Sequence, residues 1–173
     1  MSKLLLVSCC APCSCGVIKF LSQKGEDFSV LFYNPNIRPE AEYRKRADEN
    51  KRICELYQVP FIELEYDNER WCLLTEGLEN LPERSHRCDI CFEMRLKRAF
   101  EYAKENGFTR VSSVLGVSRY KDFDQVNRAA ERAGGIGLYE ATNWRKGGLQ
   151  EIALALKEEL SLYNQTYCGC KPR

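Results

Sequence analysis

Apolar residues along the chain form short continuous runs, separated by longer stretches in which they recur every three or four positions. The runs at residues 3–9 (KLLLVSC) and 28–37 (FSVLFYNPNI) indicate strands, because a strand covered on both faces is apolar at consecutive positions. Between them, residues 15–25 place aliphatic side chains on one face and end at a glycine, which is typical of a helix.

The same alternation continues through the rest of the sequence. It predicts helices at residues 39–57, 68–78, 122–135 and 149–163, and strands at residues 60–66, 110–118 and 137–143. Within residues 81–108 it predicts a further helix that has Cys88 and Cys91 in its first turn and stops at Gly107. Strands that alternate with helices imply right-handed crossovers and a mainly parallel sheet with helices on both faces. We therefore predict an α/β fold, a single-domain Rossmann-like (PP-loop/HUP-like) sandwich of about five strands over residues 1–173.

This fold class predicts where a ligand binds. In open parallel sheets, ligands bind beyond the carboxyl ends of the strands, where loops lead into helices. Residues 9–13, 34–37 and 116–121 follow the first, second and fourth predicted strands. We expect these three loops to share one cleft, with the free N–H groups of the first helix pointing into it.

The composition bears on the compartment and on the partners. The apolar run at residues 4–7 is far shorter than a membrane span of about 20 residues, and no export signal is evident. We expect a cytoplasmic protein without membrane association. The net charge of +1 argues against a strongly basic nucleic-acid coat and leaves room for a local basic patch.

The chain contains 10 cysteines, a high number for its length. In the reducing cytoplasm structural disulfides are rare, so metal or redox chemistry is the leading explanation. Cys10 and Cys13 at a strand-to-helix junction have the spacing of a thioredoxin-like dithiol. Together with Cys88 and Cys91 they would also satisfy a tetrahedral zinc site. Alternatively, the adjacent Cys9 and Cys10 with Cys88 and Cys91 would suit an iron–sulfur cluster.

The C-terminal cysteine pair and two cysteines on predicted helices have different interpretations. Cys168 and Cys170 flank one glycine, so a disulfide between them would close a small strained ring that is easily reduced. Such a pair is a plausible electron relay, and two further metal ligands are the alternative. Cys54 and Cys72 lie among apolar residues on predicted helices, and we expect both to pack as core.

Two groups of polar residues lie near the predicted cleft. His86, the only histidine, occupies a polar loop, and we do not assign it a catalytic role. Asp89 lies between two cysteines, as a helix cap or an oxygen ligand of a metal. Basic residues on loops that could surround the mouth and contact phosphates are Arg38, Arg119, Lys121, Arg145 and Lys146.

Five motifs run in order along the whole chain. They are Cys9-Cys10-Ala11-Pro12-Cys13-Ser14, Tyr33-Asn34-Pro35-Asn36-Ile37, Arg87-Cys88-Asp89-Ile90-Cys91, Lys146-Gly147-Gly148 and Tyr163-Asn164-Gln165-Thr166-Tyr167-Cys168-Gly169-Cys170. Each is weak alone, but together they are specific, and the chain resembles the QueH family of epoxyqueuosine reductases.

The resemblance implies the last step of queuosine synthesis, the two-electron deoxygenation of epoxyqueuosine at the wobble position of tRNA. It also implies a [4Fe–4S] cluster, and the cluster ligands carried over to this sequence are Cys9, Cys10, Cys88 and Cys91. The C-terminal tail at residues 168–173 would carry a redox-active pair, Cys168 and Cys170. The resemblance further implies a second metal, expected to be iron, with Cys13 and Asp89 as its candidate ligands.

The implied partners are the anticodon loop of a tRNA and an electron donor such as a ferredoxin or flavodoxin. Two positions depart from the family pattern: Cys15 stands where a threonine or another small residue is common, and Val117-Ser118-Arg119 replaces a Ser-Pro turn.

Two other classes of protein share parts of this pattern. A zinc-stabilised α/β module that binds tRNA would use the same thiols without catalysis. A tRNA-modifying enzyme related to the PP-loop ATPases would share the fold, but it should carry a Ser-Gly-Gly-x-Asp-Ser phosphate loop after the first strand. Residues 9–14 read Cys-Cys-Ala-Pro-Cys-Ser instead, so we do not expect ATP use.

Overall fold

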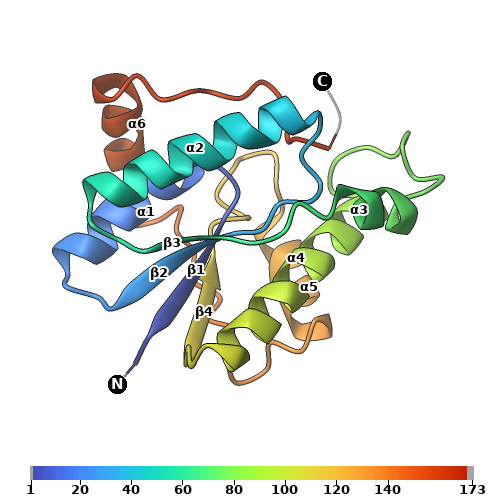
Figure 1. The fold of residues 1–173 in the computed structure, drawn as a ribbon, viewed down its shortest axis with the longest axis horizontal. Coiled ribbons are helices and arrows are strands. Elements are labelled where there is room, and N and C mark those ends of the chain that lie inside the picture. The colour runs from blue at the N-terminus through green and yellow to red at the C-terminus, as the bar shows by residue number, and fades with distance from the viewer. Residues whose placement is uncertain (1, 171–173) are drawn as a thin grey trace.

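A parallel sheet lies between two layers of helices in the computed structural model, which describes residues 2–170 (Figure 1). Its strands are β1 (Leu4–Ser8), β2 (Phe28–Phe32), β3 (Phe61–Glu63) and β4 (Arg110–Ser113), in the order β3-β2-β1-β4. All three strand pairings are parallel, with Leu6 of β1 opposite Val30 of β2 and Ser112 of β4. The predicted α/β class is confirmed.

The helices divide between the two faces of the sheet. Their bounds are α1 (Ala11–Gln23), α2 (Glu40–Leu56), α3 (Asn68–Leu74), α4 (His86–Glu105), α5 (Phe123–Arg132) and α6 (Leu149–Glu159). One hydrophobic core joins the sheet to α1, α2 and α6, and a second core joins its other face to α4 and α5 (Figure 1). No helix among residues 2–170 is long and apolar enough to cross a membrane.

Strand β1 supplies both cores because its side chains alternate between the two faces. Leu4 and Leu6 pack against α1, whereas Leu5 and Val7 pack against α4, and all four are at most 1% exposed. Burying one such side chain stabilises the fold by roughly 1.5–3 kcal/mol. The strand therefore holds its carboxyl end, where the cysteines begin, at the centre of the molecule.

The fifth strand predicted at residues 137–143 is reduced to a single parallel bridge between Val111 and Tyr139. After Glu140 the backbone turns away, because Trp144 folds back to become buried and its Nε1–H donates to Ser112 Oγ at 3.1 Å. The sheet therefore has four strands among the described residues rather than five.

The segment after α6 is extended rather than helical. Helix α6 ends at Glu159, before the predicted end at residue 163, and residues 160–170 run back across the ends of the strands toward α2 (Figure 1). Of the tail predicted at residues 168–173, residues 171–173 lie outside the described residues.

Candidate active site: a cavity lined by cysteines

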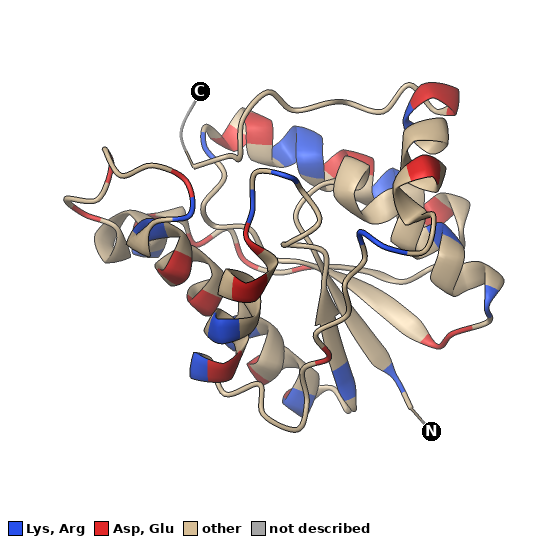
Figure 2. Cartoon of the chain, turned by 180° about the vertical axis from the view of Figure 1, so that it is seen from behind, with Lys and Arg blue, Asp and Glu red and all other residues tan. Residues whose placement is uncertain are grey.

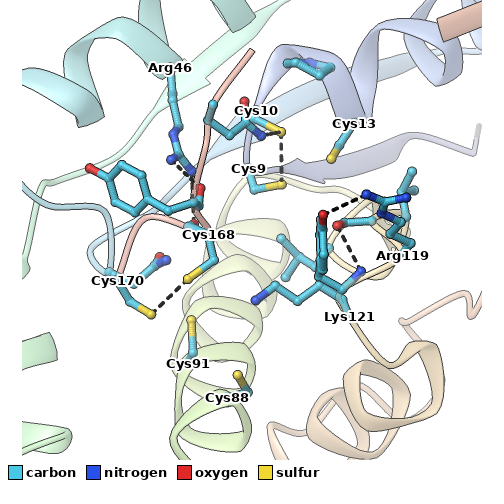
Figure 3. A pocket seen from close by; sticks show the side chains of 18 of the residues that line it. Cys9, Cys10, Cys13, Arg46, Cys88, Cys91, Arg119, Lys121, Cys168 and Cys170 are labelled. Atoms are coloured by element: carbon cyan, nitrogen blue, oxygen red, sulfur yellow. Dashed lines mark hydrogen bonds between the residues drawn. The ribbon is translucent and has the colours of Figure 1, made fainter. Parts of the chain in front are cut away.

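A cavity of ≈ 640 Å³ opens at the carboxyl ends of the strands (Figure 3). The loop after β1, residues 117–121 after β4, the first turns of α4 and the tail from residue 164 form its walls, and Asn36 adds the loop after β2. The predicted convergence of three loops in one cleft is confirmed. The tail is a fourth wall that the strand-and-helix pattern did not predict.

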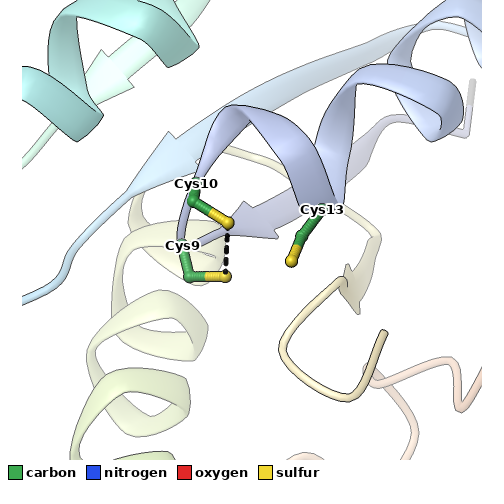
Figure 4. Close-up of side chains that lie close together, drawn as sticks. All are labelled: Cys9, Cys10 and Cys13. Atoms are coloured by element: carbon green, nitrogen blue, oxygen red, sulfur yellow. Dashed lines mark hydrogen bonds between the residues drawn. The ribbon is translucent and has the colours of Figure 1, made fainter. Parts of the chain in front are cut away.

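Cys9, Cys10 and Cys13 place their sulfur atoms within 4.8 Å of one another (Figure 4). The strand ends at Ser8 and the helix begins at Ala11, so the two residues between them lie where the strand's alternation has stopped. Both thiols therefore turn to the same side, with Cys9 Sγ 3.7 Å from Cys10 Sγ. Cys13 reaches the same point from the first turn of α1.

The three thiols differ in pKa because they donate hydrogen bonds to one another. Hydrogen bonds from Cys10 and Cys13 hold the pKa of Cys9 well below its ordinary value, against the effect of burial, and the positive charges of Arg95 and Arg46 act in the same direction. For Cys10, the contact with Cys13 lowers the pKa, but donation to Cys9 and burial outweigh it and raise the pKa to about 12. The hydrogen bond to Cys10 raises the pKa of Cys13. Cys9 is therefore the thiol of the trio that loses its proton most readily.

Cys88 and Cys91 face the same cavity from α4, each 8% exposed (Figure 3). They are three residues apart, so they lie on one face of the first turns of this helix. Burial raises the pKa of the Cys91 thiol. One turn further along, the buried Arg95 donates to Cys91 Sγ at 3.6 Å and to the side-chain oxygen of Asn34.

Cys168 and Cys170 complete the set of cavity thiols, and their sulfur atoms are 3.1 Å apart (Figure 3). The hydrogen bond to Cys168 and partial burial raise the pKa of the Cys170 thiol. Gly169 between them has a φ of +114°, and a Cβ added there would lie 2.8 Å from Ile37 Cγ1. Only glycine fits this position without displacing Ile37 or the tail.

Every main-chain carbonyl from Tyr167 to Cys170 accepts a hydrogen bond from an arginine residue. Arg46 donates to the carbonyls of Tyr167 and Cys168 at 2.8 and 3.0 Å. The main-chain N–H of Arg38 donates to Gly169 at 2.9 Å, and the buried Arg87 donates to Cys170 at 3.1 Å. We call these four bonds the carbonyl clamp. It fixes the backbone on both sides of the thiol pair.

The tail also contacts the trio directly. Gln165 donates from Nε2 to Cys10 Sγ at 2.8 Å, and its buried Oε1 has no hydrogen-bond partner among the described residues. An N–H donor on a cavity sulfur is the kind of contact that tunes a bound cluster.

Asp89 does not join the cavity. Its carboxylate accepts from Gln125 Nε2 at 2.9 Å, lies 3.6 Å from Arg132 and is 3.7 Å from His86. The helical turn that points Cys88 and Cys91 inward turns the residue between them toward α5. The structure therefore brings Cys13 to the other thiols, but not Asp89, and it leaves His86 exposed outside the cavity.

The cysteines expected to be bystanders lie apart from the cavity. Cys15 is fully buried against α6. Cys54 is fully buried in the core, as predicted. Cys72 is only half-buried, and its sulfur accepts a hydrogen bond from Arg38 at 3.4 Å.

Of the five basic loop residues predicted near the cavity, two line it and three do not. Arg119 and Lys121 line the cavity, while Arg145 donates to main-chain carbonyls of the loop that carries them. Lys146 is exposed and does not line the cavity, and neither does Arg38.

The donor set fits a thiolate-bound metal centre. Seven sulfurs line one cavity, from Cys9, Cys10, Cys13, Cys88, Cys91, Cys168 and Cys170. None is in a disulfide, and thiolates are the ligands that iron–sulfur clusters and zinc prefer. Side-chain N–H donors from the buried Arg95 and the partly buried Gln165 point at two of these sulfurs.

Comparison with solved structures identifies the same fold. The U34-tRNA thiolase NcsA from Methanococcus maripaludis, solved with its [4Fe–4S] cluster, matches with a TM-score of 0.59 and 16% identity. The match covers 99% of this chain and 62% of that one. At this identity it shows the Rossmann-like fold, which confirms the predicted architecture.

Comparison with curated proteins finds close relatives over nearly the whole chain. The chain is 46% identical to the epoxyqueuosine reductase QueH of Histophilus somni, over 98% of this chain and 71% of that protein. It is 46% identical to the Acinetobacter baylyi protein of the same name, over 97% and 78%. The Thermotoga maritima protein is 30% identical over 98% and 89%. The family model described as epoxyqueuosine reductase QueH matches residues 4–171, so the chain belongs to the QueH family.

Proposed function

We propose that this protein reduces epoxyqueuosine in tRNA to queuosine, with an iron–sulfur cluster bound among the cysteines of the cavity. The observation that carries the proposal is the convergence of thiols from three separate segments on one cavity, in a chain that matches the QueH family over residues 4–171. The enzyme is accordingly an oxidoreductase.

The proposed [4Fe–4S] ligands are Cys9, Cys10, Cys88 and Cys91. The first two lie at the end of β1 and the other two on α4, on opposite walls of the cavity (Figure 3). A cluster bound there supplies electrons one at a time. Cys13 is close enough to Cys9 and Cys10 to join them in holding metal, so it is our candidate ligand for a second metal, proposed as iron.

The reaction removes one oxygen atom. An epoxide, two electrons and two protons give an alkene and water, so both C–O bonds break and one C=C bond forms. We propose that a one-electron carrier of the ferredoxin or flavodoxin class supplies the electrons. We propose that Cys168 and Cys170, whose sulfurs are 3.1 Å apart, hold two reducing equivalents, because two thiols release two electrons and two protons when they form a disulfide.

The substrate reaches the cavity as a base that has left the stack of the anticodon loop. Exposed Tyr120 and Arg119 at the mouth stack on each other, with Arg119 4.9 Å from the ring centroid, and offer flat surfaces to a base. Figure 2 shows Lys and Arg on the loop between β4 and α5 and on the loop before α6, where phosphates could be contacted. We place this activity in the cytoplasm, where tRNA is modified.

Anaerobic purification with counts of iron, sulfide and zinc tests the metal part of the proposal. We expect about four sulfides and about five irons per chain, four in the cluster and one as the second metal. The sulfide and the cluster irons should be lost in Cys88→Ala and retained in the matched control Cys15→Ala, whose thiol is buried away from the cavity. Zinc without iron or sulfide would overturn the cluster and favour a structural zinc module.

Reduction of epoxyqueuosine-containing tRNA, measured by mass spectrometry of the released nucleosides, tests the activity. With dithionite as the electron source, the wild type should form queuosine in amounts exceeding the enzyme. A cluster-loaded protein that binds this tRNA but forms no queuosine would contradict the proposal.

A further inference from the structure

The loop that follows β4 is held by two arginine side chains along its whole length. Arg145 donates to the carbonyls of Val117, Ser118 and Lys121 at 3.1, 2.6 and 2.7 Å. Arg84, from the segment before α4, donates to the carbonyls of the two residues between them, at 2.7 and 3.2 Å. All five carbonyls of residues 117–121 are therefore fixed. A surface loop held this firmly gives its side chains defined positions.

The side chain at the end of this loop, Lys121, points into the cavity toward the thiols (Figure 3). It is 17% exposed, and its Nζ lies 3.9 Å from the Glu83 carboxylate, beyond hydrogen-bond distance. Burial disfavours its charge, but the negative charges available on Cys168, Cys88, Glu83 and Cys91 outweigh burial and raise the pKa of Lys121. The ammonium is thus held in its protonated form beside the cavity sulfurs.

The other cations of the cavity are committed elsewhere. Arg46 and Arg87 donate to tail carbonyls, and Arg95 donates to Asn34 and Cys91. Arg119 donates to the Tyr120 hydroxyl at 2.8 Å. A guanidinium also does not release its proton in proteins, whereas an ammonium does. Lys157, the other lysine of the lining, approaches from α6, where its charge acts on the buried Cys15.

We propose that Lys121 is a catalytic residue, the acid that donates a proton to the epoxide oxygen as the C–O bonds break. The inference rests on the proposed function and assigns the proton donor that the reaction needs. One proton moves from Lys121 Nζ to the leaving oxygen, and solvent supplies the second, so the oxygen departs as water. The two electrons enter from the one-electron carrier, and Lys121 regains its proton from solvent.

Single-turnover reduction of epoxyqueuosine-containing tRNA by cluster-loaded protein tests this assignment. Lys121→Met should lower the rate at least about 100-fold, the contribution typical of general acid catalysis, while the Kd for the tRNA changes less than about threefold. Lys121→Arg keeps the charge but cannot transfer the proton, and it should stay as slow as Lys121→Met. Lys104→Met, a control at an exposed lysine on α4 outside the cavity, should keep the wild-type rate.

Two further measurements separate proton donation from a structural role. Added alkylammonium ions should speed Lys121→Ala, with a rate that depends on the pKa of the amine. The wild-type rate should fall at alkaline pH as Lys121 loses its proton, and the Lys121→Arg profile should lack this limb. The rates are normalised to the variant protein that retains the cluster, so partial loss of the cluster does not prevent these measurements.

Three outcomes overturn the inference. They are a wild-type rate in Lys121→Met, full activity in Lys121→Arg, and no amine rescue together with an alkaline limb that survives in Lys121→Arg. A cluster-loaded wild type that forms no queuosine would instead overturn the proposed function, and this inference with it, so the two failures are distinguishable.

Discussion

The main-chain oxygen of Cys168 accepts a hydrogen bond of 3.0 Å from Nη1 of Arg46, which lies 122 residues earlier in the chain. Arg46 is 3% exposed, and its Nε is held by Glu42 at 2.8 Å. Glu42 in turn accepts from the Tyr163 hydroxyl at 2.7 Å. Helix α2 therefore grips the tail at two points on either side of Gln165.

Replacing Arg46 should release the thiol pair. In Arg46→Lys the ammonium cannot serve Glu42 and two carbonyls at once, and loss of one hydrogen bond to a charged group costs about 1.5–3 kcal/mol. Iodoacetamide should then alkylate Cys168 and Cys170 roughly 10-fold faster or more, since each 1.4 kcal/mol is a factor of ten. Peptide mass spectrometry of the metal-free protein measures this rate.

The matched control for that experiment is Arg44→Lys, because Arg44 lies on the same helix with a side chain 49% exposed. It should leave the alkylation rate unchanged. Equal rates in wild type and Arg46→Lys would show that the carbonyl clamp does not limit access to the pair.

Gly169→Ala should disturb the tail without unfolding the protein. Its positive φ and the 2.8 Å approach to Ile37 Cγ1 both oppose a side chain, and the residue lies at the edge of the fold. We expect turnover to fall at least about 10-fold, with a small change in Tm. Thermal unfolding and turnover of the same preparation measure both.

Gly107→Ala is the control for the glycine substitution. Gly107 also has a positive φ, of +71°, but a Cβ there meets nothing within 4 Å. It should cost about 1–2 kcal/mol of stability and leave turnover unchanged. Similar losses of turnover in both variants would assign the effect to backbone strain in general.

Arg95→Gln should lower the reduction potential of the proposed cluster. The reduced cluster carries more negative charge than the oxidised one, so removing a buried cation and an N–H donor from Cys91 destabilises the reduced form. We expect a fall on the order of tens of millivolts, where about 59 mV is tenfold for one electron. A redox titration followed by absorbance measures it.

Arg98→Gln provides the comparison, since Arg98 lies on the same helix but pairs with Glu65 at 2.8 Å outside the cavity. The reduction potential of the cluster in Arg98→Gln should equal that in the wild type. A shift in Arg98→Gln as large as that in Arg95→Gln would mean that net charge, rather than the contact with Cys91, sets the potential.

The buried Cys54 should make folding sensitive to alkali. Burial raises the pKa of this thiol from 9.0 to about 12. Between these values the unfolded chain has lost a proton that the folded chain retains, so stability is full below pH 9.0 and falls as the pH rises. One such thiol costs roughly 2 kcal/mol at about pH 10.5.

Urea unfolding of wild type and Cys54→Ala at neutral and alkaline pH checks this prediction. The variant is less stable at neutral pH because it leaves a small cavity, but it should lose about 2 kcal/mol less on going to about pH 10.5. Parallel losses in the two proteins would show that Cys54 does not titrate during unfolding.

The sequence pattern predicted the parts of the fold in which the buried apolar positions repeat with the spacing of a single strand or helix. The apolar runs of β1, β2 and β4 were predicted, because parallel strands are buried on both faces. The position of Cys9 and Cys10 at the end of β1 was predicted with them. The segment at residues 137–143 has the composition of a strand, but Trp144 must reach Ser112, so only one bridge forms. A contact between distant residues decided that case.

The same distinction applies to the site. The thiols can be recognised as candidates from their residue type alone. Arg46 and Arg95 lie in charged helices, where the sequence does not distinguish a buried guanidinium from a solvated one. Their roles depend on carbonyls and sulfurs from other segments. Gln165 could have been noticed only through its place in the tail motif. Asp89 shows the reverse case, because a promising residue type between two cysteines points toward α5 instead.

The wall formed by residues 164–170 has a consequence for how the protein is made. The ribosome produces Cys9 and Cys10 early and Cys88 and Cys91 midway, whereas the segment that carries Gln165 and the clamped thiols emerges well after them. Until it emerges, the cavity stays open along that side. If the proposed metal is delivered at that stage, it meets an accessible set of thiols, and docking of the late segment then closes over them.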